Sequence, residues 1–173
     1  MPAPLLWLGA AALGIYASNK ANTANMRRKG IVSIMPEDDS FGVIPKNGTV
    51  VCCGIYEILD HTGVWVDGNI YELNGSGLVR CVSPERFLSN RSGDAIYAAC
   101  SDVDVIGDEL CALRAKEHLY ALYDYHLIRQ NCHRFVAEMI LGANRDVTSF
   151  SELNEFLHQQ YSTTIAWRPV VQN

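Results

Sequence analysis

The sequence predicts an α+β domain in which a small antiparallel sheet packs against helices. Asp67-Gly68 lies between two alternating apolar runs, which is typical of a two-residue β-hairpin turn. Asn131 precedes a run with an apolar stripe at helical spacing, and residues 149–152 form a capping box that begins a further helix. The chain has 173 residues, 49% of them hydrophobic, which suffices for one domain with its own core.

The N-terminal segment, residues 1–19, carries no charged side chain, and the basic residues 27–29 follow it. Because a membrane span needs about 20 apolar residues and basic residues favour the cytoplasmic side, we expect a transmembrane anchor that leaves the following domain in the cytoplasm. The alternatives are a cleaved signal, with a secreted or periplasmic domain, and a soluble helix packed on the domain or on a partner. Residues 20–30 are expected to form a polar linker, and residues 31–173 the domain.

The remaining elements follow from local patterns. Strands are indicated by β-branched and apolar runs, and we expect the chain end to add one at the sheet edge. The expected strands cover residues 49–56, 78–82, 95–100 and 163–171. Helices are indicated by a Ser-Pro start, by an amphipathic run and by the capping box. The expected helices cover residues 83–88, 108–122 and 150–161.

The hairpin around Asp67-Gly68 fixes which side chains share a face. A two-residue turn pairs residue 66 with 69 and residue 64 with 71, so Val64, Val66, Tyr71 and Leu73 form an apolar core face. The opposite face then carries a histidine beside a carboxylate and an amide. Its members are His61, Gly63, Trp65, Ile70, Glu72 and Asn74.

Asn131 is a favourable N-cap, because its side chain can accept a hydrogen bond from an amide of the first helical turn. Cys132 then occupies the first position of a helix that Gly142 ends. The helix dipole and the N–H groups there favour an anion, so we expect a lowered thiol pKa and amides able to hold a developing oxyanion. The pattern indicates a thiol nucleophile, which needs a base from elsewhere in the chain.

The six cysteines do not form a disulfide framework or a zinc-binding CxxC pair. We expect reduced thiols, mostly buried in strands or a helix, and neither a metal nor another cofactor. They are Cys52, Cys53, Cys81, Cys100, Cys111 and Cys132. The net charge of −5 argues against nucleic acid as the main partner.

Three blocks of this sequence resemble the lecithin–retinol acyltransferase (LRAT)-like domain, a circularly permuted relative of NlpC and papain-like cysteine hydrolases. The blocks are PKNGTVV at residues 45–51, HTGVWV at 61–66 and NCHRF at 131–135. The resemblance covers roughly residues 42–145 and implies a permuted papain-like fold, with the histidine strand before the cysteine helix. It also implies that Cys132 is the nucleophile and His61 the general base.

The third catalytic position departs from that family, many members of which carry a second histidine on the strand after the hairpin. Glu72 is the nearest match here, one residue early, and a carboxylate can orient an imidazole and stabilise its cation. Asn74 is the reserve candidate. Trp65 and Asn131 are further candidates for orienting or binding the substrate.

Three functions stay open at the level of the sequence. The first is an acyltransferase or acyl hydrolase that forms a Cys132 thioester, with lipid acyl chains favoured as substrates by a membrane anchor. The second is an NlpC-type cysteine amidase or peptidase that acts on cell-wall or isopeptide bonds. The third is a non-catalytic interaction domain, which the retention of both Cys132 and His61 disfavours.

Overall fold

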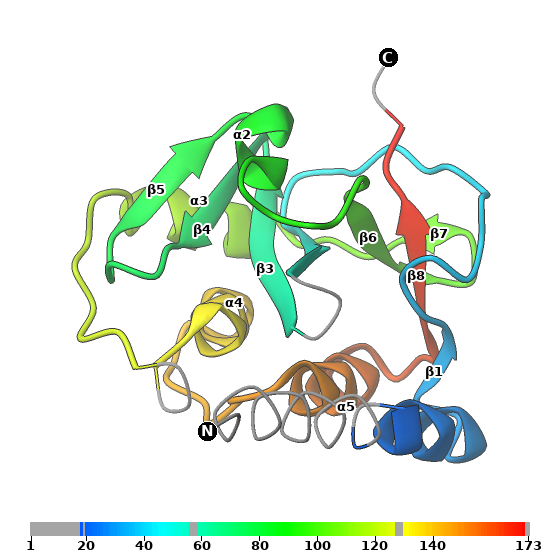
Figure 1. Cartoon of the computed structure of the whole chain (residues 1–173). Coiled ribbons are helices and arrows are strands. Elements are labelled where there is room, and N and C mark those ends of the chain that lie inside the picture. The colour runs from blue at the N-terminus through cyan, green and yellow to red at the C-terminus, as the bar shows by residue number, and fades with distance from the viewer. Residues whose placement is uncertain (1–17, 19, 56–58, 127–129, 172–173) are drawn as a thin grey trace, which may run out of the picture.

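The computed structural model describes residues 18, 20–55, 59–126 and 130–171, and it shows an α+β fold built on a mixed sheet (Figure 1). Among these residues the sheet has eight strands, in the order β1-β8-β6-β2-β3-β4-β5, with β7 paired to β6 beside this path. The strands are β1 (Val32–Ile34), β2 (Thr49–Ile55), β3 (Leu59–Val66), β4 (Asn69–Leu73), β5 (Val79–Val82), β6 (Tyr97–Ser101), β7 (Asp104–Val105) and β8 (Ile165–Pro169). The helices are α2 (Pro84–Leu88), α3 (Glu109–Glu117), α4 (Cys132–Leu141) and α5 (Phe150–Tyr161), preceded by helical residues 20–28.

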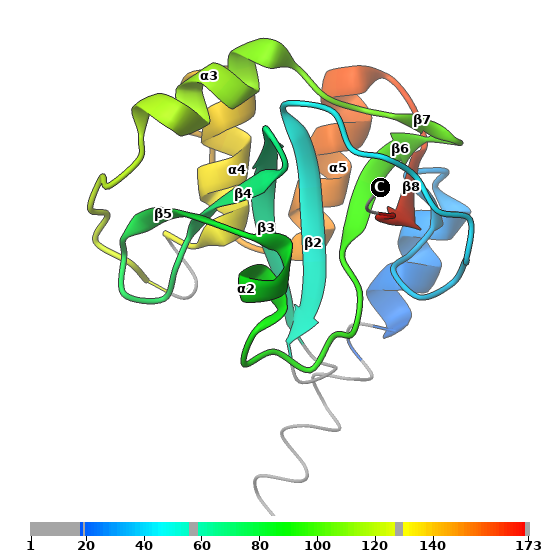
Figure 2. The same ribbon diagram turned by 90° about the horizontal axis from the view of Figure 1, so that it is seen from above.

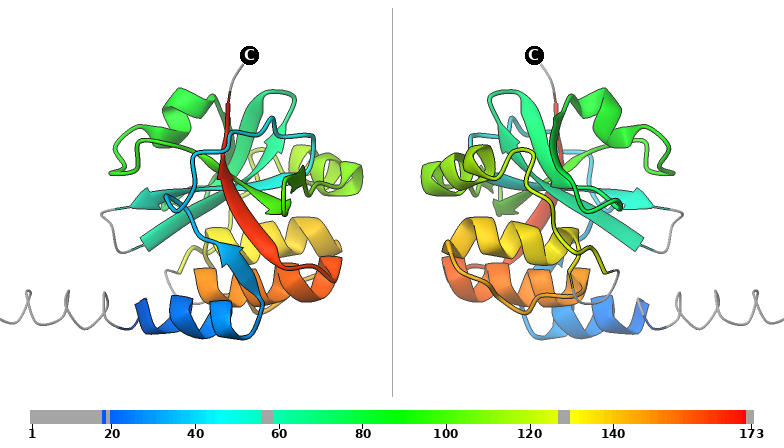
Figure 3. Two further views of the ribbon diagram at one scale, coloured as in Figure 1. Left: turned by 90° about the vertical axis from the view of Figure 1, so that its right-hand side faces the viewer. Right: turned by 90° about the vertical axis from the view of Figure 1, so that its left-hand side faces the viewer.

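The two faces of the sheet are covered unequally. Helices α4 and α5 lie side by side on one face, and the short helix α2 lies on the other (Figures 2 and 3). The larger core cluster lies under α3, α4 and α5, and it includes the apolar stripe of α4, namely Phe135, Val136, Met139 and Ile140. The smaller cluster joins the opposite face of the sheet to Phe87 of α2.

The register of the β3–β4 hairpin is the one that the turn signal predicts. Val66 pairs with Asn69, and Val64 pairs with Tyr71. Val64 lies in the larger core cluster, whereas Trp65 lies in the smaller one, so the predicted alternation of faces is confirmed. Since the register is correct, Glu72 lies on the same face as His61.

Two expectations about the sheet are wrong. The sheet is mixed rather than antiparallel, because β1 pairs with β8 in parallel. The C-terminal strand β8 is not at the edge, since it lies between β1 and β6. The pairing of β1 with β8 joins segments more than 130 residues apart, and no local pattern reveals a contact over that distance.

The helix expected over residues 108–122 is shorter than predicted. Asp108 caps it, and it ends at Glu117, with Tyr120 in a left-handed conformation at φ 68°. The following backbone turns back to the edge of β5, where the amide of Tyr120 donates to Val79 O and the amide of Val79 donates to Ala121 O. These hydrogen bonds to a sheet edge replace those that a longer helix would make.

The expected transmembrane helix is contradicted in the part of the chain that the structure describes. No helix there is long and apolar enough to cross a membrane. Residues 1–17 and 19, which hold nearly all of the apolar segment, lie outside the described residues. Residues 20–28 of the expected linker are helical, and Met26, 3% exposed, packs into the larger core cluster.

We predict that Met26→Ala lowers the free energy of unfolding by about 2–5 kcal/mol, since it empties a buried site that one apolar side chain fills. Chemical denaturation of the full chain measures the change. Asn22→Ala, on the exposed side of the same helix, is the matched control and should change the stability by less than about 0.5 kcal/mol. Equal stability of Met26→Ala and wild type would show that the packing of Met26 does not stabilise the domain.

Candidate active site

Cys132 is the first residue of α4, as predicted, and Asn131 is the N-cap. The side-chain oxygen of Asn131 accepts from the amides of His133 (3.1 Å) and Arg134 (3.2 Å), and its nitrogen donates to Thr148 O at 2.7 Å. Gly142 ends the helix in a left-handed conformation. The cap therefore fixes the start of α4, and with it the position of the Cys132 thiol.

The thiol of Cys132 hydrogen-bonds to the imidazole of His61 on β3. Burial alone would raise the pKa of Cys132, but the charge and hydrogen bond of His61 and two further hydrogen bonds bring it below its ordinary value. Burial lowers the pKa of His61, yet the Cys132 thiolate and the Glu72 carboxylate raise it on balance. Both shifts favour a thiolate–imidazolium pair. Because only 5% of Cys132 and 6% of His61 are exposed, solvent screens this pair weakly.

Thr62 makes the two further hydrogen bonds to Cys132, one from its main-chain N–H and one from its side chain. In an antiparallel strand alternate residues direct their N–H groups to opposite neighbours. The N–H of Thr62 points to the same side of β3 as the N–H groups of Val64 and Val66, which face β4. The pairing of β3 with β4 stops at Val64, so β4 offers Thr62 no partner in this ladder. The N–H of Thr62 thus reaches the sulfur where the hairpin ladder ends.

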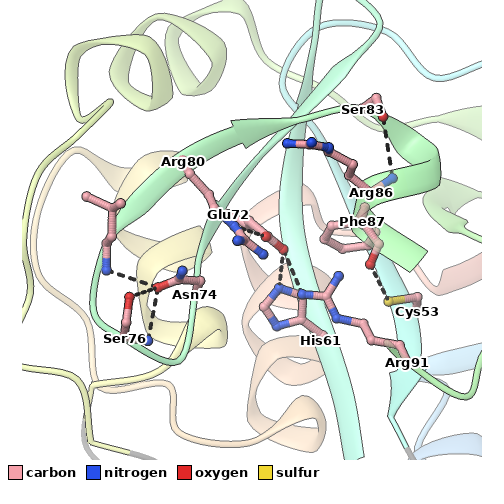
Figure 4. A network of polar contacts seen from close by, with 11 residues as sticks. Cys53, His61, Glu72, Asn74, Ser76, Arg80, Ser83, Arg86, Phe87 and Arg91 are labelled. Carbon is pink, nitrogen blue, oxygen red and sulfur yellow. Dashed lines mark hydrogen bonds and ion pairs between the residues drawn. The ribbon is translucent and has the colours of Figure 1, made fainter. Parts of the chain in front are cut away.

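Glu72 on β4 is the carboxylate beside His61, as the register predicts (Figure 4). Its Oε2 atom lies 2.6 Å from His61 Nε2, and its side chain is fully buried. This contact leaves Nδ1 of the ring for the Cys132 sulfur. The imidazole is therefore held between a thiol and a carboxylate, the arrangement that a general base requires.

Two arginines also hold Glu72. Arg80 Nε on β5 donates to Oε1 at 2.6 Å, and Arg91 Nη2 in the loop after α2 donates to Oε2 at 2.9 Å. Burial raises the pKa of Glu72, but His61 and the arginines outweigh it and lower the pKa to about 2. Glu72 is consequently a carboxylate at every physiological pH, so its charge is always available to His61.

Gly63 and Phe87 define the wall beside the imidazole. The Phe87 ring lies 5.2 Å from the His61 ring, centroid to centroid, and the Arg91 guanidinium lies 4.8 Å over the same phenyl ring. A Cβ atom at Gly63 would come within 2.5 Å of Ile70 Cγ2 and 3.3 Å of Phe87. Glycine at this place lets α2 pack closely enough to hold the His61 ring from one side.

The other predicted site residues, Asn74, Trp65 and Asn131, are held by a turn, by the core and by the start of α4. Asn74 is bound in the β4–β5 turn, where its side-chain oxygen accepts from Ser76 N, Ser76 Oγ and Leu78 N. Trp65 is 9% exposed and packs in the smaller core cluster. Asn131 is engaged as a helix cap. Of the two candidates for the third position, Glu72 therefore lies at His61, whereas Asn74 is engaged in the turn. The roles of Asn74, Trp65 and Asn131 in orienting or binding a substrate stay predictions.

Sequence reasoning missed four residues of this site, namely Thr62, Arg80, Arg91 and His133. The ring Nδ1 of His133 lies 3.2 Å from Thr62 Oγ1. The position of Thr62 directly after His61 was a usable signal, since one strand then offers groups on both faces. Arg91 carried no such signal, because the close approach of Gly93 to the backbone of Gly54 places its loop.

Five of the six cysteines are buried and all are free, whereas Cys81 is exposed on β5. Burial raises the pKa of Cys53 to about 12, of Cys100 to about 11 and of Cys111 to about 12. Burial also raises the pKa of Cys52. Cys132 is thus set apart from the other buried thiols by its hydrogen bonds and by the charge of His61.

Within the described residues no group of three or more His, Cys, Asp and Glu side chains is placed to hold a metal ion. Protein-family models, curated protein sequences and solved structures give no significant match to this chain.

We predict that Cys132 is the buried cysteine that iodoacetamide modifies fastest in the native protein near pH 7, because thiolates react and its pKa is the lowered one. The measurement is limited alkylation followed by peptide mapping, in a Cys81→Ser background that removes the exposed competitor. Alkylation in denaturant, where all remaining cysteines are modified, is the control. Faster labelling of Cys53 or Cys111 would contradict the assignment.

We predict that Glu72→Gln lowers the rate of Cys132 acylation by about 10–10⁴-fold, the upper figure being the cost of losing the orienting carboxylate in a serine-protease triad. The loss of charge also lowers the pKa of His61 and weakens the ion pair. The thiol then stays protonated to a higher pH, so the acid limb of the rate–pH profile should move to higher pH.

Glu85→Gln, an exposed carboxylate on α2, is the matched control and should leave the profile unchanged. Circular dichroism has to show that Glu72→Gln is folded, because removing one partner of a buried ion pair costs about 3–5 kcal/mol. A folded Glu72→Gln protein with the rate and profile of wild type would reduce the site to a Cys132–His61 dyad.

Proposed function

We propose that this protein is an enzyme that uses Cys132 as a nucleophile to transfer or hydrolyse acyl groups through a thioester intermediate. The observation that supports this most strongly is the continuous series of contacts from the thiol to His61 and on to Glu72, 2.6 Å from the ring. Burying charges is costly, and apolar side chains would stabilise the same place at least as well. A perturbed thiol, imidazole and carboxylate in one place therefore favour catalysis over packing.

The reaction follows from the positions of these groups. The Cys132 thiolate adds to a carbonyl carbon, the bond from that carbon to the leaving oxygen or nitrogen breaks, and the His61 imidazolium gives its proton to the leaving group. An alcohol, amine or water then attacks the thioester. His61 takes the proton of the attacking group, and Cys132 departs as the thiolate. Glu72 holds the ring and stabilises its cation in both steps.

The negative charge that develops on the carbonyl oxygen has to be stabilised by a hydrogen-bond donor. The amides of His133 and Arg134 are occupied by the Asn131 cap, and the amide of Phe135 donates to Asn131 O. These three amides of the first turn are therefore not available as donors of an oxyanion hole. We assign this role to the amide of Cys132 itself, the first of α4, where the helix dipole adds to its effect.

The order of elements fits the family resemblance, and we include it in the proposal. The histidine strand β3 precedes the cysteine helix α4 in the chain, as in the permuted papain-like arrangement of LRAT-like domains. On that basis acyl esters and amides, lipids among them, are the proposed substrates. A peptide amidase of the NlpC type would use the same residues, so the choice of acyl donor has to separate the two.

We predict that the protein gains the mass of an acyl group when it is incubated with an activated ester such as p-nitrophenyl butyrate. Intact-mass spectrometry detects the adduct, and hydroxylamine should remove it because the bond is a thioester. Parallel incubations with a phospholipid in mixed micelles and with a peptide amide identify the class of donor.

The matched variants are Cys132→Ala, which should lose the adduct, and Cys81→Ser, which should keep it. An adduct that persists in Cys132→Ala, or none with any donor, would overturn the proposal. An adduct formed with the peptide amide and not with the lipid would favour the amidase over the lipid acyltransferase.

A further inference from the structure

The sulfur of Cys132 has a second set of contacts besides the imidazole. Thr62 reaches it with both its main-chain N–H and its hydroxyl, and the same hydroxyl oxygen lies 3.2 Å from Nδ1 of His133. His133 follows Cys132 in α4, and its ring also lies 6.0 Å from the Phe150 ring of α5. The three residues therefore form a buried series from His133 to Thr62 to the sulfur.

The number of available protons decides what this series can do. A threonine hydroxyl has one proton to donate, and its oxygen can accept from other groups. If that proton points to the sulfur, Nδ1 of His133 has to be the donor to Thr62. If instead Nδ1 is unprotonated, Thr62 donates to it and the sulfur loses one hydrogen bond. The tautomer of His133 thus determines whether Thr62 supports the thiolate.

We propose that His133, as the Nδ1–H tautomer, donates to Thr62 Oγ1 while the Thr62 hydroxyl donates to Cys132 Sγ, so that both residues position and stabilise the nucleophilic thiolate. This inference rests on the proposed role of Cys132. It adds two positioning residues that are distinct from the His61–Glu72 side of the site.

The surroundings of His133 suit a neutral donor. Burial, followed by the positive charge of His61, lowers the pKa of His133 to about 3, against a smaller opposing effect of Glu152. The ring is therefore uncharged in the physiological range and holds a single proton. Because neither His133 nor Thr62 titrates there, this donor series persists at a pH where His61 has lost its charge.

Other ionisable groups interact electrostatically with the sulfur. Asp60 of β3, Cys53 of β2 and Tyr125 before α4 interact with it, and burial raises the pKa of Asp60 to about 7. Ionisation of Asp60 opposes that of the thiol. A comparison of variants that leaves these groups unchanged isolates the contribution of Thr62 and His133.

The first experiment measures ionisation of the Cys132 thiol by the difference in absorbance at 240 nm between each full-length variant and the same variant with Cys132→Ala. Thr62→Val keeps the N–H and removes the hydroxyl, and it should lower the ionisation constant of the thiol about 10–100-fold, as expected for loss of a hydrogen bond to a charged group. Thr62→Ser restores the hydroxyl and should match wild type. A Thr62→Val thiol that ionises as in wild type would overturn the proposal.

The second experiment addresses His133. His133→Asn offers a side-chain N–H near the position of Nδ1 and should retain most of the thiol acidity, whereas His133→Leu should lose it. Two-dimensional ¹⁵N NMR of the histidine rings in the intact protein reports the tautomer without any substitution. The Nδ1–H form supports the proposal, and the Nε2–H form overturns it even where a variant fails to fold.

These measurements need no substrate, so they separate this inference from the proposed function. If no acyl donor labels the protein while thiol acidity still follows Thr62 and His133, the proposed function fails and the donor series stands. If an acyl donor labels the protein and substitution of Thr62 and His133 leaves the thiol pKa unchanged, the proposed function stands and the donor series fails.

Discussion

A fully buried carboxylate, that of Glu72, is the constraint on which the site depends. A buried charge is tolerated only with partners, and here they come from three separate segments: His61 of β3, Arg80 of β5 and Arg91 of the loop after α2. The charge of Glu72 therefore has all its partners only when the β3–β4 register, strand β5 and the loop after α2 are in place together. The same requirement fixes the His61 ring in front of Cys132.

Strand β3 serves the thiol from both of its faces. His61 lies on the face that α2 and Phe87 cover, while Thr62 extends toward α4 and His133. Alternation along one strand thus brings a charged partner and a neutral donor to the same sulfur. The first depends on the protonation of an imidazole, and the second, as we propose, on a tautomer that does not change in the physiological range.

Much of the local structure could be predicted because its causes are local. Asp67-Gly68 sets a two-residue turn, and the turn sets the register that puts Glu72 beside His61. Asn131 caps α4, and Gly142 ends it. Where a contact joins distant segments, local patterns did not reveal it: β1 beside β8 makes the sheet mixed, and Met26 of a helix in the expected linker is buried in the core.

The sequence by itself determined that Cys132 begins a helix and that Glu72 lies beside His61, because a cap, a turn and the period of a strand are properties of neighbouring residues. That His61 lies at Cys132 followed from the family resemblance alone. Only the tertiary structure decided the rest of the site. Arg91 reaches Glu72 because Gly54 and Gly93 allow two backbones to meet, and His133 reaches Thr62 because α4 packs against the open end of the hairpin ladder. Such contacts depend on the packing of elements far apart in the chain, which no local pattern encodes.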